Sequence, residues 1–200
     1  MNAPLEIPEP VLIGYFAKPV TSRPEWLKAE QVEEVCSWDA CRIGRLVDWI
    51  HLWRHNAEWV FSTPELAWSV VTEAVRSQCQ LFGYRLYPVR FRLGVRESYQ
   101  LPDYSEAEVL GFAPQWPEAM DCSFERLGYD LVPRNCEANF ECSPLCCADL
   151  AVEVPTNRYC LLDTAEEAFA LAPTLEVPGQ PPRGEPGPYH IVEVWRRRRS

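Results

Sequence analysis

The sequence contains no apolar run of the length that a membrane-spanning helix requires, because charges or prolines interrupt every hydrophobic stretch. Its first ten residues lack the basic segment and the apolar run of a secretory signal. Glycine-rich phosphate loops and the Gly-x-Ser-x-Gly turn of hydrolases are also absent, and the chain has only nine glycines. We therefore expect a soluble cytoplasmic protein without a membrane partner or a nucleotide-binding loop.

A disulfide framework is not expected either. The nine cysteines are an odd number at irregular spacings, whereas disulfide frameworks are normally even-numbered and belong to short secreted domains. We expect free thiols, most of them small buried hydrophobic side chains.

The chain does have enough apolar material for a core. Of its 200 residues 47% are hydrophobic, which suits a single domain over residues 1–200. The net charge is -10, and the four arginines at 196–199 leave -14 for the rest of the chain. Such an acidic body repels phosphate backbones, so nucleic acid is disfavoured and a basic protein partner is favoured. Lysine is scarce among the basic residues, and on this association we expect a bacterial source.

Hydrophobic spacing predicts helices and strands that alternate only in part. The predicted helices cover residues 24–36, 43–55, 64–75 and 144–152, with a fifth starting at 164. The predicted strands cover residues 11–16, 84–93, 109–112, 129–132, 159–162 and 190–195. This order predicts an α+β fold, with a mostly antiparallel or mixed sheet packed against several helices. A Pro/Gly-rich loop at about 173–188 and a basic, solvated C-terminal tail at 196–200 complete the prediction.

Three local signals refine these elements. Ser62 or Thr63 is predicted to cap the helix that starts at Pro64, in a Ser62-x-x-Glu65 capping box. Thr164-x-x-Glu167 predicts a second capping box. Pro88 has no N–H for a strand ladder, which places its strand at an edge of the sheet or at a bulge.

One candidate metal site lies on the helix predicted at 43–55. Asp48, His51 and His55 follow one another at offsets of three and four, which places them on one helix face, where they could share a divalent metal. The pattern is short and arises easily by chance, and tryptophans at 49, 53 and 59 offer these histidines structural partners instead. We expect no cofactor, with zinc as the alternative.

The cysteines offer a second metal hypothesis. Cys142 and Cys146 could form one half of a structural zinc site and Cys36 and Cys41 the other, although these intervals differ from those of usual zinc sites.

A cysteine nucleophile is a further hypothesis. Cys146 and Cys147 fall in the first turn of the helix predicted after Pro144, where the helix dipole lowers the pKa of a thiol. The base would be His190 or His55, and the orienting carboxylate Asp149 or Asp163. Adjacent cysteines in an apolar turn are more often part of a core.

The arginines at 196–199 could pair with an acidic protein surface or contact RNA, although like charges at a chain end are normally solvated. Since no catalytic signature is specific, the favoured function is a non-enzymatic protein-binding domain, such as an immunity-type or regulatory protein. The alternative is a small enzyme that uses a metal at Asp48, His51 and His55 or a nucleophile at Cys146 with His190.

Overall fold

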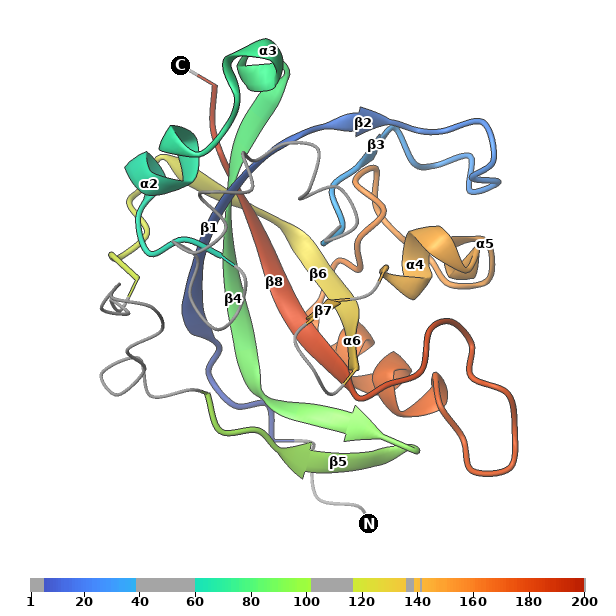
Figure 1. The fold of residues 1–200 in the computed structure, drawn as a ribbon. Helices are drawn as coiled ribbons and strands as arrows, with labels where there is room; N and C mark the ends of the chain where they lie inside the picture. The colour runs from blue at the N-terminus through green and yellow to red at the C-terminus, as the bar shows by residue number, and fades with distance from the viewer. Residues whose placement is uncertain (1–5, 39–59, 102–116, 136–138, 141, 200) are drawn as a thin grey trace.

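The computed structural model describes residues 6–38, 60–101, 117–135, 139–140 and 142–199. Its main feature is a six-stranded antiparallel sheet in the order β1-β4-β8-β6-β7, with β5 also paired to β4 (Figure 1). The strands are β1 Val11–Pro19, β4 Cys79–Arg92, β5 Val95–Ser98, β6 Phe124–Asn135, β7 Asn139–Phe140 and β8 Tyr189–Arg197. A separate two-stranded ribbon joins β2 (Thr21–Ser22) to β3 (Glu34–Val35).

The helices are short. They are α2 Pro64–Ser69, α3 Glu73–Arg76, α4 Pro144–Cys147, α5 Leu150–Glu153 and α6 Ala165–Leu171, followed by the 3-10 helix η3 Ala172–Thr174. The predicted antiparallel sheet is confirmed, but the fold is richer in strand than the predicted α+β balance. None of the helices in the described ranges is long and apolar enough to cross a membrane.

The strand predicted at 11–16 is confirmed as β1, and the strand predicted at 84–93 is the second half of β4. Along that half Tyr87, Val89 and Phe91 are buried, as the period of two predicts. The register between β4 and β8 shifts between Leu86 and Arg90, so Pro88 lies in a bulge where its missing N–H costs no ladder bond. The alternative edge position is wrong, because β4 has neighbours on both sides.

The strands predicted at 129–132 and 190–195 are confirmed as the central parts of β6 and β8. The chain returns at its C-terminal end to insert β8 between β4 and β6, and β8 continues through Arg196 and Arg197. These two arginines therefore belong to the sheet, where residues 82 and 124 pair with them.

Two helix starts follow the expected chemistry. Thr63 caps α2, since its hydroxyl oxygen accepts a hydrogen bond of 3.0 Å from the Leu66 N–H. The cap is therefore Thr63 rather than Ser62. At α6 the predicted capping box is confirmed, because Thr164 and Glu167 each accept a backbone N–H from the other.

The helix predicted at 144–152 is broken into α4 and α5 by Asp149, whose φ of 56° is left-handed. The helix predicted at 24–36 is wrong. This segment forms turns and then β3, because the N–H groups of Glu33 and Glu34 bond to the carbonyl oxygen of Arg158 rather than within a helix. Its apolar residues Leu27 and Val32 are buried nevertheless, so tertiary pairing overrides the helical spacing.

The strand predicted at 159–162 is also wrong. Only Leu162 pairs with the sheet, in a single bridge to Tyr129, and the φ of 61° at Cys160 prevents an extended run. Residues 175–188 form bends and turns without a regular element, as their prolines and glycines predict. The helix predicted at 43–55 and the strand predicted at 109–112 lie outside the described residues.

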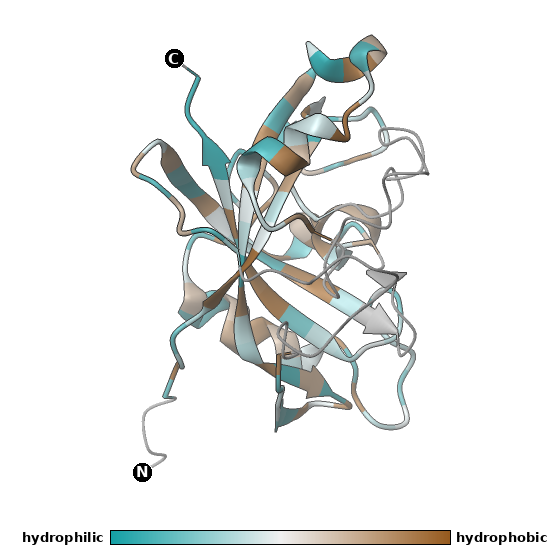
Figure 2. Ribbon diagram, turned by 60° about the vertical axis from the view of Figure 1, so that its left-hand side comes forward, coloured by the Kyte–Doolittle hydropathy of each residue, from teal (hydrophilic) through white to brown (hydrophobic). Residues whose placement is uncertain are grey.

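Two clusters of buried apolar side chains cover the sheet. The first surrounds Phe82 and lies against α2, and the second lies beneath α6 around Phe169. The strands β4, β6 and β8 contribute side chains to both clusters. Hydrophobic residues follow these strands, whereas the C-terminal end of β8 is hydrophilic (Figure 2).

Candidate functional site

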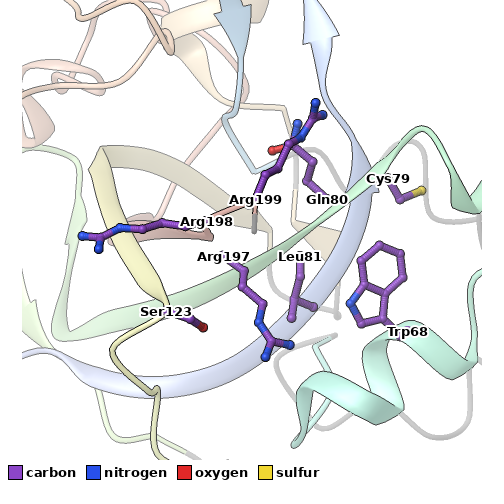
Figure 3. A pocket seen from close by; sticks show the side chains of 8 residues that line it. All are labelled: Trp68, Cys79, Gln80, Leu81, Ser123, Arg197, Arg198 and Arg199. Atoms are coloured by element: carbon purple, nitrogen blue, oxygen red, sulfur yellow. The ribbon is translucent and has the colours of Figure 1, made fainter.

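A pocket opens at the C-terminal end of β8. Its volume is about 740 Å³, and it is lined by Trp68, Cys79, Gln80, Leu81, Ser123, Arg197, Arg198 and Arg199. The lining comes from α2, from the first residues of β4, from the residue before β6, and from the last residue of β8 with the two residues after it (Figure 3). The pocket thus joins segments from four parts of the chain.

Backbone pairing sets the positions of the arginines. Phe124 on β6 lies opposite Arg197, and the Arg198 N–H donates to the carbonyl oxygen of Ser123 at 2.8 Å. Arg197 extends on the same side as Leu81 and Trp68, whereas Arg198 extends away from Trp68 (Figure 3). The guanidinium of Arg197 therefore lies beside the apolar wall of the pocket.

The four arginines differ in how far their charges are compensated. Arg196 is the most buried, with an ion pair of 2.8 Å to Glu34, and Arg198 lies 3.5 Å from Glu125. Among the described residues Arg197 and Arg199 have no carboxylate within ion-pairing distance, although both are exposed. The segment predicted as a solvated tail at 196–200 thus continues β8 through Arg196 and Arg197 and contributes Arg197, Arg198 and Arg199 to the pocket.

One acidic group lies close to this positive charge. Two hydrogen bonds from Ser123 lower the pKa of Asp121, and Arg197 lowers it further. Asp121 therefore stays ionised, but its oxygen is already engaged by Ser123.

This arrangement suits an anionic ligand. A guanidinium forms paired hydrogen bonds with carboxylate or phosphate oxygens, and the partly buried Trp68 offers an aromatic face to an apolar neighbour of that anion. A pocket lined by arginines and a tryptophan can therefore bind an anion that has an apolar neighbour.

The predicted nucleophile Cys146 lies elsewhere, on α4, and its thiol is buried among polar groups. Its sulfur is 3.2 Å from the Ser37 hydroxyl oxygen and 3.5 Å from the Ser143 carbonyl oxygen. Two nearby thiols are held in the protonated form, because burial raises the pKa of Cys36 to about 11 and raises that of Cys160 as well.

The predicted base His190 is buried on β8, opposite Arg90 and Val132, and its ring packs edge-on against Tyr99 with 4.6 Å between centroids. The described contacts of Cys146 do not include His190. The two carboxylates proposed to orient an imidazole bond to other side chains. Asp149 pairs with Lys28 at 2.7 Å, and Asp163 accepts a hydrogen bond from Asn157.

The residue that the sequence prediction missed is Asp130, a fully buried carboxylate in the middle of β6. It accepts hydrogen bonds from the Trp38 N–H at 2.6 Å, the Ser143 hydroxyl at 2.5 Å and the Leu131 N–H at 2.8 Å. Burial raises its pKa to about 6, against the opposing effects of these donors and of Lys18. The sequence did offer one signal for a buried carboxylate, because Asp130 is the single acidic residue in the apolar run Tyr-Asp-Leu-Val.

The proposed metal ligands Asp48, His51 and His55 lie outside the described residues, as does Cys41 of the alternative zinc site. Within the part of the chain that the structure describes, no group of three or more His, Cys, Asp or Glu side chains is arranged to hold a metal ion.

Comparisons with known proteins place the chain in no family. No family model matches it, and neither the curated proteins nor the solved structures include a match.

Proposed function

We propose that this chain is a non-enzymatic binding protein that takes an acidic segment of a partner protein into the arginine-rimmed pocket. The observation that carries the proposal is that Arg197 and Arg199 line the same pocket as Trp68 and form no ion pair with a carboxylate of the described residues. Such a pair favours a segment with carboxylates next to an apolar or aromatic side chain.

A protein segment fits the charge of the whole molecule better than a nucleic acid does. The net charge of -10 opposes a long phosphate backbone, whose attraction to a protein extends over many charges. A short acidic segment needs only the local positive charge, since charges beyond the Debye length of about 8 Å are largely screened at physiological salt. The basic partner that the net charge favours would use other surfaces, and it stays a prediction.

Catalysis by Cys146 is not favoured, because its side chain is buried and hydrogen-bonded to the Ser37 hydroxyl and to the Ser143 carbonyl oxygen, so a substrate has no open approach to it. The neighbouring thiols of Cys36 and Cys160 have raised pKa values. Metal-dependent catalysis at Asp48, His51 and His55 stays a prediction of the sequence, as do an immunity-type or regulatory role and a cytoplasmic location.

A peptide-binding experiment tests this function. Fluorescence anisotropy would compare labelled peptides that carry several Glu and Asp residues around one Phe with peptides in which Lys replaces the acids. We expect the acidic peptides to bind and the affinity to fall as salt is added. Arg197→Gln should weaken binding by about tenfold or more, because a charged hydrogen bond contributes roughly 1.5–3 kcal/mol.

The matched control is Arg92→Gln, which removes another exposed arginine at the far end of β4. It should bind the acidic peptides as the unchanged protein does. Preference for the basic peptides, or equal losses in the two variants, would contradict the proposal.

A further inference from the structure

Three cysteine thiols gather around α4, at a distance from the arginine-rimmed pocket. Cys142 lies just before the helix cap Ser143, and Cys146 and Cys147 are the last two residues of α4. The sulfur atoms of Cys146 and Cys147 are 3.5 Å apart, and the Cys147 thiol is hydrogen-bonded to Cys142 as well. Cys147 is therefore the central member of the group.

The three thiols differ in exposure. Cys146 is buried and faces Ser37, whereas Cys147 is exposed and Cys142 is partly exposed. A reagent in solution can therefore reach Cys147 first and Cys142 next. The buried Cys146 is held from the other side by its bonds to Ser37 and to the Ser143 carbonyl oxygen.

Covalent geometry selects which two thiols can join. Disulfides usually need a Cα–Cα separation of about 4.4–6.8 Å, whereas consecutive Cα atoms are about 3.8 Å apart. A bond between the adjacent Cys146 and Cys147 is therefore strained. Cys142 and Cys147 are not adjacent, because four residues separate them, and a hydrogen bond joins their thiols.

We propose that Cys142 and Cys147 form an oxidisable dithiol, a modification site for low-molecular-weight disulfides of the glutathione type. The Cys147 thiolate attacks one sulfur of the small disulfide, which breaks its S–S bond and releases one thiol. The Cys142 thiolate then attacks the mixed disulfide at Cys147 and releases the second thiol. The protein loses two electrons and two protons, and the small disulfide is reduced to two thiols.

The attachment of α4 to the sheet should allow the disulfide to form without loss of the fold. Ser143 donates a hydrogen bond of 2.5 Å to the buried Asp130, and this bond anchors the start of the helix to β6. The reacting pair, in contrast, is partly or fully exposed to solvent. In a reducing compartment the pair stays a dithiol, and it forms a disulfide when low-molecular-weight disulfides accumulate.

Proton loss sets the rate of the first step. Hydrogen bonds with Cys142 and Cys146 raise the pKa of Cys147, so its thiolate is scarce at neutral pH. Exchange should therefore be slow at neutral pH and faster under mildly alkaline conditions.

Mass spectrometry of the full chain with oxidised glutathione tests the inference. The reduced protein would be incubated under mildly alkaline conditions, alkylated and digested. We expect a mass loss of two hydrogens and a peptide that links Cys142 to Cys147. In Cys142→Ser the reaction should stop with glutathione attached to Cys147, and in Cys147→Ser the internal bond should be absent.

The control variant is Cys122→Ser, which removes an exposed thiol outside α4 and should leave the internal bond intact. Glutathione on both Cys142 and Cys147 without an internal bond would overturn the inference, as would an internal disulfide that persists in Cys142→Ser. So would equal rates of alkylation at Cys147 before and after oxidation. None of these outcomes depends on peptide binding at the arginine-rimmed pocket, so the two proposals fail separately.

Discussion

The buried carboxylate of Asp130 should make the stability of the protein depend on pH. In the folded protein its pKa is raised from 3.8 to about 6, mainly because burial opposes the charged form. The folded state therefore holds this proton more tightly than the unfolded state does. The stabilising effect is complete below the ordinary pKa and is lost as the pH rises through about 6.

The magnitude follows from the two pKa values. At about pH 5 the side chain is mostly protonated in the folded state and mostly ionised in the unfolded state, whereas at about pH 7 it is ionised in both. The free energy of unfolding should therefore fall by about 1 kcal/mol between these two pH values through this group alone.

Asp130→Asn removes this titration and adds a separate cost. The carboxylate accepts from Trp38 through one oxygen and from Ser143 and Leu131 through the other. An amide has only one oxygen, so its NH₂ group must face a donor. At about pH 7, where the carboxylate is ionised and accepts all three bonds, we expect the variant to be less stable by about 1–3 kcal/mol, the cost of an unsatisfied buried donor.

Urea unfolding of both proteins at the two pH values separates these effects. The stability gap between them should narrow by about 1 kcal/mol from the lower to the higher pH, because only the original protein loses the contribution of Asp130. A gap that stays constant or widens would refute the reasoning. It would mean that Lys18 and the hydrogen-bond donors outweigh burial and hold the carboxylate as an anion.

Two further substitutions test how the fold is built. Thr164→Ala removes the capping box of α6 and should lower the free energy of unfolding by about 1 kcal/mol in urea, and no loss would show that the cap is dispensable. Gly128→Ala places a Cβ 2.6 Å from the Leu162 carbonyl oxygen at a φ of 152°. This substitution should lower the free energy of unfolding by about 2 kcal/mol or more, because overpacking and backbone strain are among the causes of large losses. The control Gly179→Ala has a φ of 80° but no atom within 4 Å, and should cost less. Equal thermal shifts in the two glycine variants would contradict the steric argument.

Much of the sheet could be predicted from the sequence, because its strands are long apolar runs with clear limits. Strand β1 starts after Pro10 and ends at Pro19, and the buried side chains of Tyr87, Val89 and Phe91 alternate along β4 with more exposed ones. The order of the strands could not be predicted in this way. It depends on the return of β8 between β4 and β6, which no local pattern in residues 190–195 encodes.

The sequence predictions were wrong where the backbone forms hydrogen bonds with distant segments instead of local ones. Residues 24–36 have helical spacing, yet Glu33 and Glu34 donate to Arg158, more than a hundred residues further along. The pocket was missed for a similar reason. Trp68, Leu81 and Ser123 are unremarkable in the sequence, and only strand pairing brings them to the arginines that were taken for a free tail.

The 14-residue strand β4 has one more consequence. It starts at the arginine-rimmed pocket, crosses the first cluster, bends at Pro88 and ends in the second cluster near α6. Its backbone hydrogen bonds connect β1, β5 and β8. Neither cluster can melt without releasing part of the same strand, so the two halves of the molecule form one cooperative unit. A ligand that binds at the pocket end would therefore slow amide exchange in the half that it does not touch.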